Sequence, residues 1–175
     1  MSVIETERLV LRRFTPEDAE ENYRIYTDPL NMRFMGGPPD SVESERHQIR
    51  RHISHYYERH GFGLWAAVLK ENGRLVGRCG FLRHEVEGAR EVEVSYLIDR
   101  HYRGRGLATE AAREAVRLGF EMYGFPRIVA MINPENVASV RVAEKLGMRY
   151  ERDADFQDYG KVRMYALEAR DFVNT

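Results

Sequence analysis

The sequence predicts an α/β (α+β) fold built on a mixed, mostly antiparallel twisted sheet with one central strand–helix–strand crossover. Three observations predict it. Apolar runs of strand length follow one another through the middle of the chain, an Asn-Gly pair joins two of them, and only one strand passes through a glycine-rich turn into a long helix. With 175 residues, 43% of them apolar, residues 1–175 suffice for a single domain with one core.

The N-terminal third predicts one strand and two helices. Residues 8–14 predict a strand, and Thr15-Pro16 then supplies an N-cap and a proline at the first helical position, so a helix is expected to reach Tyr26. Asp28-Pro29 and the segment 36–39, Gly-Gly-Pro-Pro, interrupt the chain. A second, highly charged helix is expected from Ser41 to about residue 60.

The middle of the chain predicts an antiparallel meander. Residues 64–69 and 74–82 predict two strands joined by the Asn72-Gly73 turn. Residues 91–98 predict a third strand, because apolar positions 92, 94, 96 and 98 alternate with Glu91 and Glu93 on the other face. The turn at 99–106 then leads into a helix that is expected to reach Tyr123.

The remaining segments complete the sheet. Residues 127–132 predict a short apolar strand that lies parallel to strand 91–98 after the crossover. A loop leads to a helix over 137–146 that Gly147 ends, and residues 148–169 predict two closing strands that turn at Gly160.

Charge and composition exclude several classes of protein. The 27 Lys and Arg residues balance 28 Asp and Glu residues, so no basic field exists for general nucleic-acid binding. The longest apolar run, 64–69, is too short to cross a membrane, and Glu5 and Glu7 are unlike a secretory signal. The single Cys79 makes no intrachain disulfide, so we expect a cytoplasmic protein.

The turn at 103–108, Arg-Gly-Arg-Gly-Leu-Ala, predicts an anion site. The first amides of a helix have no intrahelical partner and attract anions, and Gly104 and Gly106 let a phosphate approach the backbone. A pyrophosphate is the expected ligand, although two glycines can also simply make a tight turn. A P-loop is excluded because no Gly-Lys-Ser/Thr follows. A dinucleotide site is disfavoured because Thr109 replaces its third small residue and strand 127–132 has no acid.

Three stretches resemble a known family. Residues 94–111, VSYLIDRHYRGRGLATEA, resemble the acetyl-coenzyme A motif of the GNAT superfamily of N-acetyltransferases. Residues 133–139 with 144–148 resemble its second motif. Residues 5–12, ETERLVLR, resemble the start of the branch that contains the ribosomal-protein alanine N-acetyltransferases. One departure is His101, where the motif usually has Gln or Arg.

The resemblance implies an acetyl-CoA-dependent acyltransferase that acts without an acyl-enzyme on a primary amine, either a protein N-terminal α-amine or a small-molecule amine. The strand before the loop is implied to separate from the next parallel strand and to pair with the pantetheine arm of the cofactor. The implied cofactor contacts are Tyr96, Leu97, Ile98, Arg103, Gly104, Arg105, Gly106, Leu107, Ala108, Thr109 and Asn136. Asn136 can alternatively serve only as a helix cap.

The resemblance also implies catalytic roles. A backbone N–H near Leu97 is the expected oxyanion donor. Ser139 is the candidate acid, because Ala143 stands where many relatives have a tyrosine. Glu93, with Glu91 beside it, is the candidate base through water, and Asp155 is a second candidate. Each of these side chains also fits an ordinary solvated position.

Other residues and functions that the sequence allows are less favoured. Cys79 has no neighbouring histidine in sequence and is not expected to be a nucleophile. His52, His55 and Glu58 have helical metal-ligand spacing, but a surface pair of this kind is usually unligated, so no metal is expected. The rival function is a noncatalytic acetyl-CoA binding or sensing domain. We expect no nucleic-acid or membrane partner, and a homodimer is compatible with the sequence.

Overall fold

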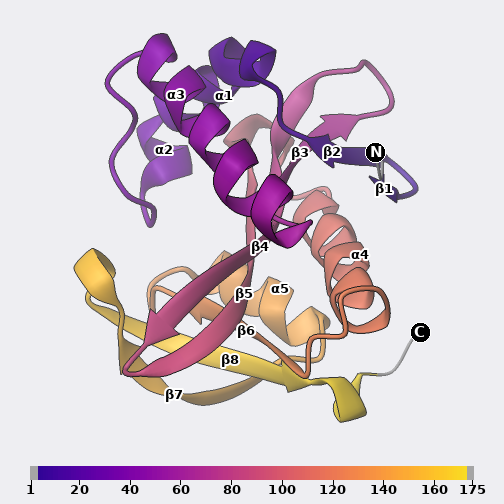
Figure 1. Cartoon of the computed structure of the whole chain (residues 1–175), viewed down its shortest axis with the longest axis vertical. Coiled ribbons are helices and arrows are strands. Elements are labelled where there is room, and N and C mark those ends of the chain that lie inside the picture. Colours follow the sequence, from indigo (N-terminus) through magenta and orange to yellow (C-terminus); the bar gives the residue numbers. More distant parts are fainter. Residues whose placement is uncertain (1–3, 173–175) are drawn as a thin grey trace.

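The computed structural model describes residues 4–172, the side chain of Asp158 aside. One eight-stranded sheet has the order β1-β2-β3-β4-β5-β6-β8-β7 (Figure 1). The β5–β6 pair is parallel and the other neighbours are antiparallel, which confirms the predicted fold class. The strands are β1 (Ile4–Glu5), β2 (Leu9–Arg13), β3 (Leu64–Leu69), β4 (Leu75–Val86), β5 (Ala89–Ile98), β6 (Arg127–Ile132), β7 (Arg149–Asp155) and β8 (Lys161–Glu168).

Five α-helices accompany the sheet within residues 4–172. They are α1 (Ala19–Tyr26), α2 (Pro29–Met32), α3 (Val42–His52), α4 (Leu107–Glu121) and α5 (Val137–Lys145). Residues of α1 and α3 pack with Leu64, Ala66 and Leu97, whereas α4 packs in the cluster that contains Cys79 and Val94. Because side chains alternate along a strand, α1 and α3 cover one face of the central strands and α4 covers the other.

Two features of the first third differ from expectation. A short helix, α2, stands where a break was predicted, because Asp28 caps it by accepting a hydrogen bond from Leu30 N–H at 2.9 Å. The second helix widens into a π-helical segment over Ile53–Glu58. His52, just before this segment, and Tyr57, within it, both form hydrogen bonds with the main chain of Leu64 in β3.

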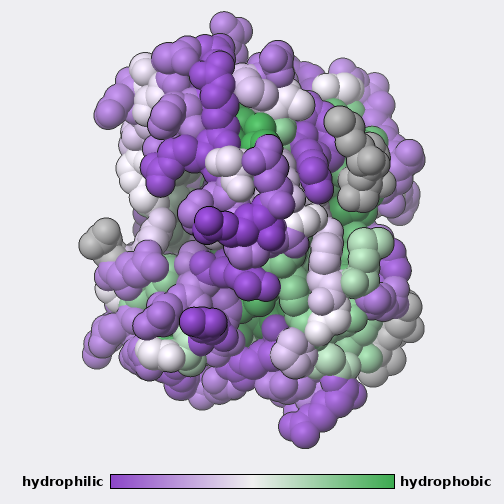
Figure 2. Space-filling model, viewed as in Figure 1, coloured by the Kyte–Doolittle hydropathy of each residue, from purple (hydrophilic) through white to green (hydrophobic). Residues whose placement is uncertain are grey.

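The inner face of α3 is defined by two buried residues, Glu45 and Ile49, while most of its other side chains are at least partly exposed. The surface seen over α3 is accordingly hydrophilic (Figure 2). No helix of the described residues is long and apolar enough to cross a membrane.

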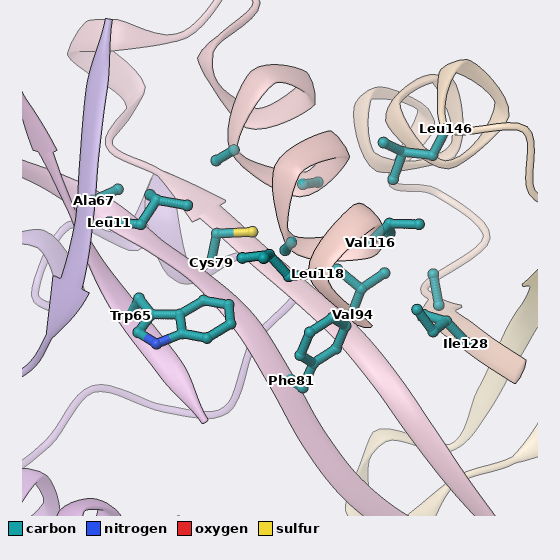
Figure 3. Packing of buried hydrophobic residues seen from close by; sticks show 14 of the residues in the cluster. Leu11, Trp65, Ala67, Cys79, Phe81, Val94, Val116, Leu118, Ile128 and Leu146 are labelled. Atoms are coloured by element: carbon teal, nitrogen blue, oxygen red, sulfur yellow. The ribbon is translucent and has the colours of Figure 1, made fainter. Parts of the chain in front are cut away.

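The main core lies between α4 and the central strands. Trp65 and Phe81 are almost fully buried and belong to the same cluster as Val116 and Leu118 of α4 (Figure 3). A Cβ on Gly119 would approach Ile128 Cδ1 to 2.7 Å, so only glycine allows α4 to pack this closely at that point. This packing fixes α4, and with it the turn that begins the helix.

The two parallel strands separate soon after they meet. β4 and β5 are paired from Gly77–Ile98 to Val86–Ala89, but β5 and β6 are paired only at Glu93 and Val129. Beyond Glu93, the β6-facing edge of β5 therefore has unused peptide groups. This is the separation that the family resemblance implied.

Candidate active site

A groove of about 670 Å³ runs along the open edge of β5, past the start of α4, to α5. We call it the α4 groove. It brings together ten of the eleven predicted cofactor contacts, the exception being Arg105. Those ten residues are Tyr96, Leu97, Ile98, Arg103, Gly104, Gly106, Leu107, Ala108, Thr109 and Asn136. Arg141 and Lys145 of α5 line it as well, and sequence reasoning did not single them out.

The turn before α4 forms a cradle of main-chain amides. Gly104 and Gly106 have φ angles of +77° and +79°, the left-handed region that favours glycine. The first intrahelical bond runs from Glu110 N–H to the Gly106 carbonyl at 3.0 Å, so the amides before Glu110 have no helical acceptor. A Cβ on Gly104 would meet no atom within 4 Å, so open space lies beside the cradle. These features fit an anionic group such as a pyrophosphate.

A side-chain bracket holds this cradle from behind. Arg8 Nε lies 2.7 Å from Glu110 Oε2, and Arg8 Nη1 donates to the Arg105 carbonyl at 2.7 Å. Thr6 Oγ1 donates to Glu110 Oε1 at 2.5 Å. Burial disfavours the Glu110 carboxylate, but the bonds from Thr6 and Arg8 outweigh it and lower its pKa. Sequence reasoning used residues 5–12 only as a family marker and missed this contact between the two stretches.

Arg103 faces the protein rather than the cradle. Its Nε donates to the Ile98 carbonyl at 3.0 Å, and its Nη2 donates to Asn31 Oδ1 at 3.2 Å. The guanidinium therefore ties α2 to the end of β5, which differs from its expected place beside a phosphate. The exposed Arg105 side chain lies 3.4 Å from Glu71, outside the groove.

His101 occupies the position of the usual Gln or Arg and binds Asp99. The Nδ1 atom of His101 lies 3.0 Å from Asp99 Oδ1, and Asp99 is 1% exposed. Burial opposes the charge, but bonds from His101, Asn31 and Arg24 lower the pKa of Asp99 to about 2. His101 thus takes part in a hydrogen-bonded turn in front of the cradle.

A second cavity, the junction cavity, lies where β5 and β6 separate. It has a volume of about 200 Å³ and shares Tyr96, Asn136 and Ser139 with the α4 groove. Glu93 lines it, and Glu93 Oε2 lies 2.9 Å from His84 Nε2. Sequence reasoning missed His84, because the strand that carries it was expected to end at residue 82. Extending that strand opposite 89–98 would have shown the pair.

The two alternative bases lie elsewhere. Glu91 lies 3.1 Å from Arg127 Nε, and Arg127 also binds Glu151 and Glu168. Glu91 therefore belongs to a charge cluster that joins the strands. Asp155 is exposed and does not line the junction cavity. Of the three predicted carboxylates, only Glu93 lies in the junction cavity.

The register of β5 changes the assignment of the oxyanion donor. Asp99 N–H donates to the Val76 carbonyl at 2.8 Å, and Leu97 pairs with Arg78 of β4. Because peptide groups alternate in direction, the Leu97 N–H also points to β4 and is used by the sheet. The Leu97 N–H itself is therefore not free, and the expected donor near Leu97 has to be a neighbouring amide. The N–H of Tyr96 points to the open edge instead.

Asn136 and Ser139 lie between the α4 groove and the junction cavity. Asn136 caps α5, since its Oδ1 accepts from Ser139 N–H at 3.2 Å. The Ser139 carbonyl accepts from the Tyr96 hydroxyl at 2.9 Å, which fixes α5 against β5. Ala143 is fully buried in the core, so no acid can act from that position.

The remaining candidates have structural roles. Cys79 is fully buried, and burial raises the pKa of its thiol to about 12, which removes the thiolate that a nucleophile needs. His52 Nε2 accepts from Leu64 N–H at 2.8 Å and is not available to a metal in this arrangement. Among residues 4–172, no group of three or more His, Cys, Asp or Glu is placed to hold a metal ion.

Comparison with known proteins decides the family. The family model described as an acetyltransferase (GNAT) domain matches residues 8–149. The chain belongs to the GNAT family of acetyltransferases. It is thus an acyltransferase, and the α4 groove lies where this GNAT chain carries the family's acetyl-CoA motif.

Individual relatives agree with that assignment. An uncharacterized N-acetyltransferase of Bacillus subtilis, YoaA, is 31% identical over 169 residues, which cover 95% of this chain and 89% of the relative. The crystal structure of a GNAT-family acetyltransferase from Bacillus anthracis is 26% identical with a TM-score of 0.77, and covers 97% of this chain and 99% of that one.

A more distant neighbour is relevant to the ligand. A ribosomal L7/L12 alpha-N-protein acetyltransferase in complex with coenzyme A has a TM-score of 0.77, covering 95% of this chain and 98% of that one. Its 17% identity shows a shared fold alone. Enzymes of the GNAT fold use acetyl-CoA, and the cradle, the open strand edge and the basic residues on α5 of this chain fit that molecule.

Proposed function

We propose that this GNAT protein transfers the acetyl group of acetyl-CoA directly to a primary amine, and that residues 1–175 form one such domain. The observation that carries the proposal is the α4 groove, in which a cradle of free amides and an unpaired strand edge lead into the junction cavity. The cradle accounts for binding a diphosphate, and the open edge of β5 accounts for binding an amide-bearing arm.

Each element of the groove has a binding role. The amides from Gly104 to Thr109 hold the diphosphate. The Tyr96 carbonyl and the Ile98 N–H pair with the arm, since the Ile98 carbonyl already accepts from Arg103. Asn136 lies at the groove's entry to the junction cavity, so it can contact the arm while it caps α5.

The chemical step then follows from the junction cavity. Acetyl-CoA supplies a thioester, whose carbonyl carbon forms a bond to the amine nitrogen while its bond to sulfur breaks. Tyr96 N–H stabilises the negative charge that develops on the carbonyl oxygen. The proton lost by the nitrogen passes through a water molecule to Glu93, which His84 orients. The Ser139 hydroxyl gives its proton to the departing sulfur and regains one from solvent.

Thiol release tests this proposal. The purified chain is mixed with acetyl-CoA and a panel of amines containing amino-acid amides, short peptides with free N-termini, alkylamines and spermidine. We expect acceptor-dependent release of coenzyme A and an acetylated product whose mass is increased by one acetyl group. Tight binding of acetyl-CoA with no turnover on any amine would instead favour the noncatalytic sensing domain.

A further inference from the structure

A third cavity lies beneath α1 and α3, on the face of the sheet opposite α4. It has a volume of about 560 Å³, and it shares Met35, Arg78 and Tyr159 with the junction cavity. We call it the helical cavity. Because Met35, Arg78 and Tyr159 line both cavities, the two cavities adjoin, and a molecule that occupies the junction cavity can extend into the helical cavity.

Arg78 has an unusual environment for a guanidinium at such a point. Its Nε is buried and has no hydrogen-bond partner among the described residues. Its guanidinium stacks over the Tyr26 ring at 5.2 Å and interacts with the Tyr26 hydroxyl, and its charge acts on the Glu45 carboxylate, which lines the same cavity. A buried donor without a partner is costly, so its retention beside a cavity indicates a ligand that supplies an acceptor.

Asn22 adds a second unpaired atom in the same cavity. It is 2% exposed, its Nδ2 donates to Glu45 Oε1 at 2.6 Å, and its Oδ1 has no partner among the described residues. Glu45 is thereby held by Asn22 rather than by Arg78. The helical cavity thus offers one unused donor and one unused acceptor, which a carbonyl oxygen and an N–H group would satisfy together.

The register places Arg78 beside the reaction centre. Arg78 pairs directly with Leu97, and the free Tyr96 amide is the neighbouring residue. Directly paired residues of antiparallel strands lie on the same face, with Cβ atoms about 5 Å apart. Ser95, two residues before Leu97 on this face, lines the junction cavity together with Arg78. An oxygen attached close to the reacting amine can therefore reach Arg78.

We infer that Arg78 selects acceptors that carry a carbonyl or carboxylate oxygen on the carbon next to the amine, as amino-acid and peptide α-amines do, and disfavours polyamines. A polyamine offers no such oxygen, so the buried Arg78 Nε would stay without an acceptor. The inference rests on the proposed function for the position of the amine. The role of Arg78 itself is inferred from its unpaired Nε and its place in the helical cavity.

Matched substrates test this role. L-leucinamide and L-phenylalaninamide are compared with 3-methylbutylamine and phenethylamine, which have the same side chains without the carboxamide. We expect Arg78→Met to raise KM for both amides at least tenfold and to change KM for the two alkylamines and spermidine less than twofold. Because the ratio of variant to wild type is taken for each substrate separately, differences in amine basicity cancel.

Two variants control for general effects of the substitution. Arg78→Lys retains the charge and should recover part of the loss on the amides. Arg74→Met makes the same chemical change at an exposed arginine just before the same strand and should change none of the values. An equal rise of KM across amides and alkylamines in Arg78→Met, or a wild type that prefers spermidine, would overturn the inference.

Binding separates this inference from the proposed function. With coenzyme A present, N-acetyl-L-leucinamide and N-(3-methylbutyl)acetamide are titrated into wild type and Arg78→Met. We expect wild type to bind the leucinamide product at least tenfold more tightly, and the variant to lose that preference. Selective binding without turnover would contradict the transferase and leave the role of Arg78 standing. Equal binding of the two products by wild type would overturn the role even if turnover is seen.

Discussion

The cradle before α4 and the helical cavity lie on opposite faces of the same sheet and are built differently. The cradle takes its donors from the main chain of one continuous stretch, 103–109, while the helical cavity takes Asn22, Glu45 and Arg78 from α1, α3 and β4. Main-chain donors survive most substitutions, whereas the side chains of the cavity can change without disturbing the sheet. The cradle could therefore be predicted from the sequence, whereas the residues of the helical cavity are brought together only in the structure.

Lowering the pH should reduce the free energy of unfolding through His52, which lines the helical cavity. Burial, with the charge of Arg78 adding to it, lowers the pKa of His52 from 6.5 to about 4. Above pH 6.5 the imidazole is neutral in both states. Between pH 6.5 and 4 the His52 imidazole is protonated in the unfolded chain but not in the folded chain. On going from pH 6.5 to pH 4 this group therefore lowers the free energy of unfolding by about 3 kcal/mol.

Urea unfolding at several pH values measures this slope. The comparison is between wild type and His52→Gln, in which a side-chain oxygen can still accept from Leu64 N–H. The slope between pH 6.5 and 4 should be shallower in the variant by the share that His52 contributes. Identical slopes in the two proteins would show that His52 titrates normally and that the helical cavity is not as buried as described.

The next largest effect tests the junction cavity, where the two sides meet. Glu93→Gln should reduce kcat about a hundredfold, within the range typical of losing a general base. Binding of coenzyme A should be unchanged, because Glu93 does not line the α4 groove. Steady-state thiol release and a coenzyme A titration measure the two quantities. Asp155→Asn is the matched control outside the junction cavity, and an unchanged kcat in Glu93→Gln would remove Glu93 as the base.

A smaller effect tests whether the side-chain bracket of Thr6, Arg8 and Glu110 holds the cradle in position. Arg8→Met removes the bonds to Glu110 and to the Arg105 carbonyl, so the cradle loses its fixed position and coenzyme A should bind about tenfold more weakly. Arg105→Ala should change that affinity less than threefold, because its side chain is exposed and lies outside the groove. Isothermal titration of both variants decides the matter. A larger loss in Arg105→Ala than in Arg8→Met would show that side-chain charge rather than cradle geometry holds the diphosphate.

Local signals predicted most of the fold. The Asn72-Gly73 turn, the alternation of 91–98 and the glycines of 103–106 each act within a few residues, and the structure has a hairpin, a strand and a helix entry there. The β4–β5 hairpin was predicted too short, because Arg83, His84 and Glu85 interrupt the apolar pattern while their backbones still pair with β5. The helix α2 was missed, because the Asp28-Pro29 pair at its start was interpreted as an interruption between helices.

The candidate site divides in the same way. Ten of the predicted cofactor contacts lie together in the α4 groove because they belong to one strand, one turn and one helix start. The role expected of Leu97 depended on which way a peptide group faces, which only the register with Arg78 determines. His84, Arg8 and Arg78 owe their positions to pairing between distant segments, so no spacing rule could have found them.

Titration of coenzyme A into wild type and Gly104→Glu tests the central claim most directly. The substitution places a negative charge in the cradle at a residue whose φ of +77° favours glycine. Gly124→Glu, with a φ of +62° and no atom within 4 Å of its Cβ, is the matched control away from the groove. The account predicts a loss of affinity of more than about a hundredfold in Gly104→Glu and wild-type affinity in the control. Equal affinity in wild type and Gly104→Glu would show that the diphosphate binds elsewhere.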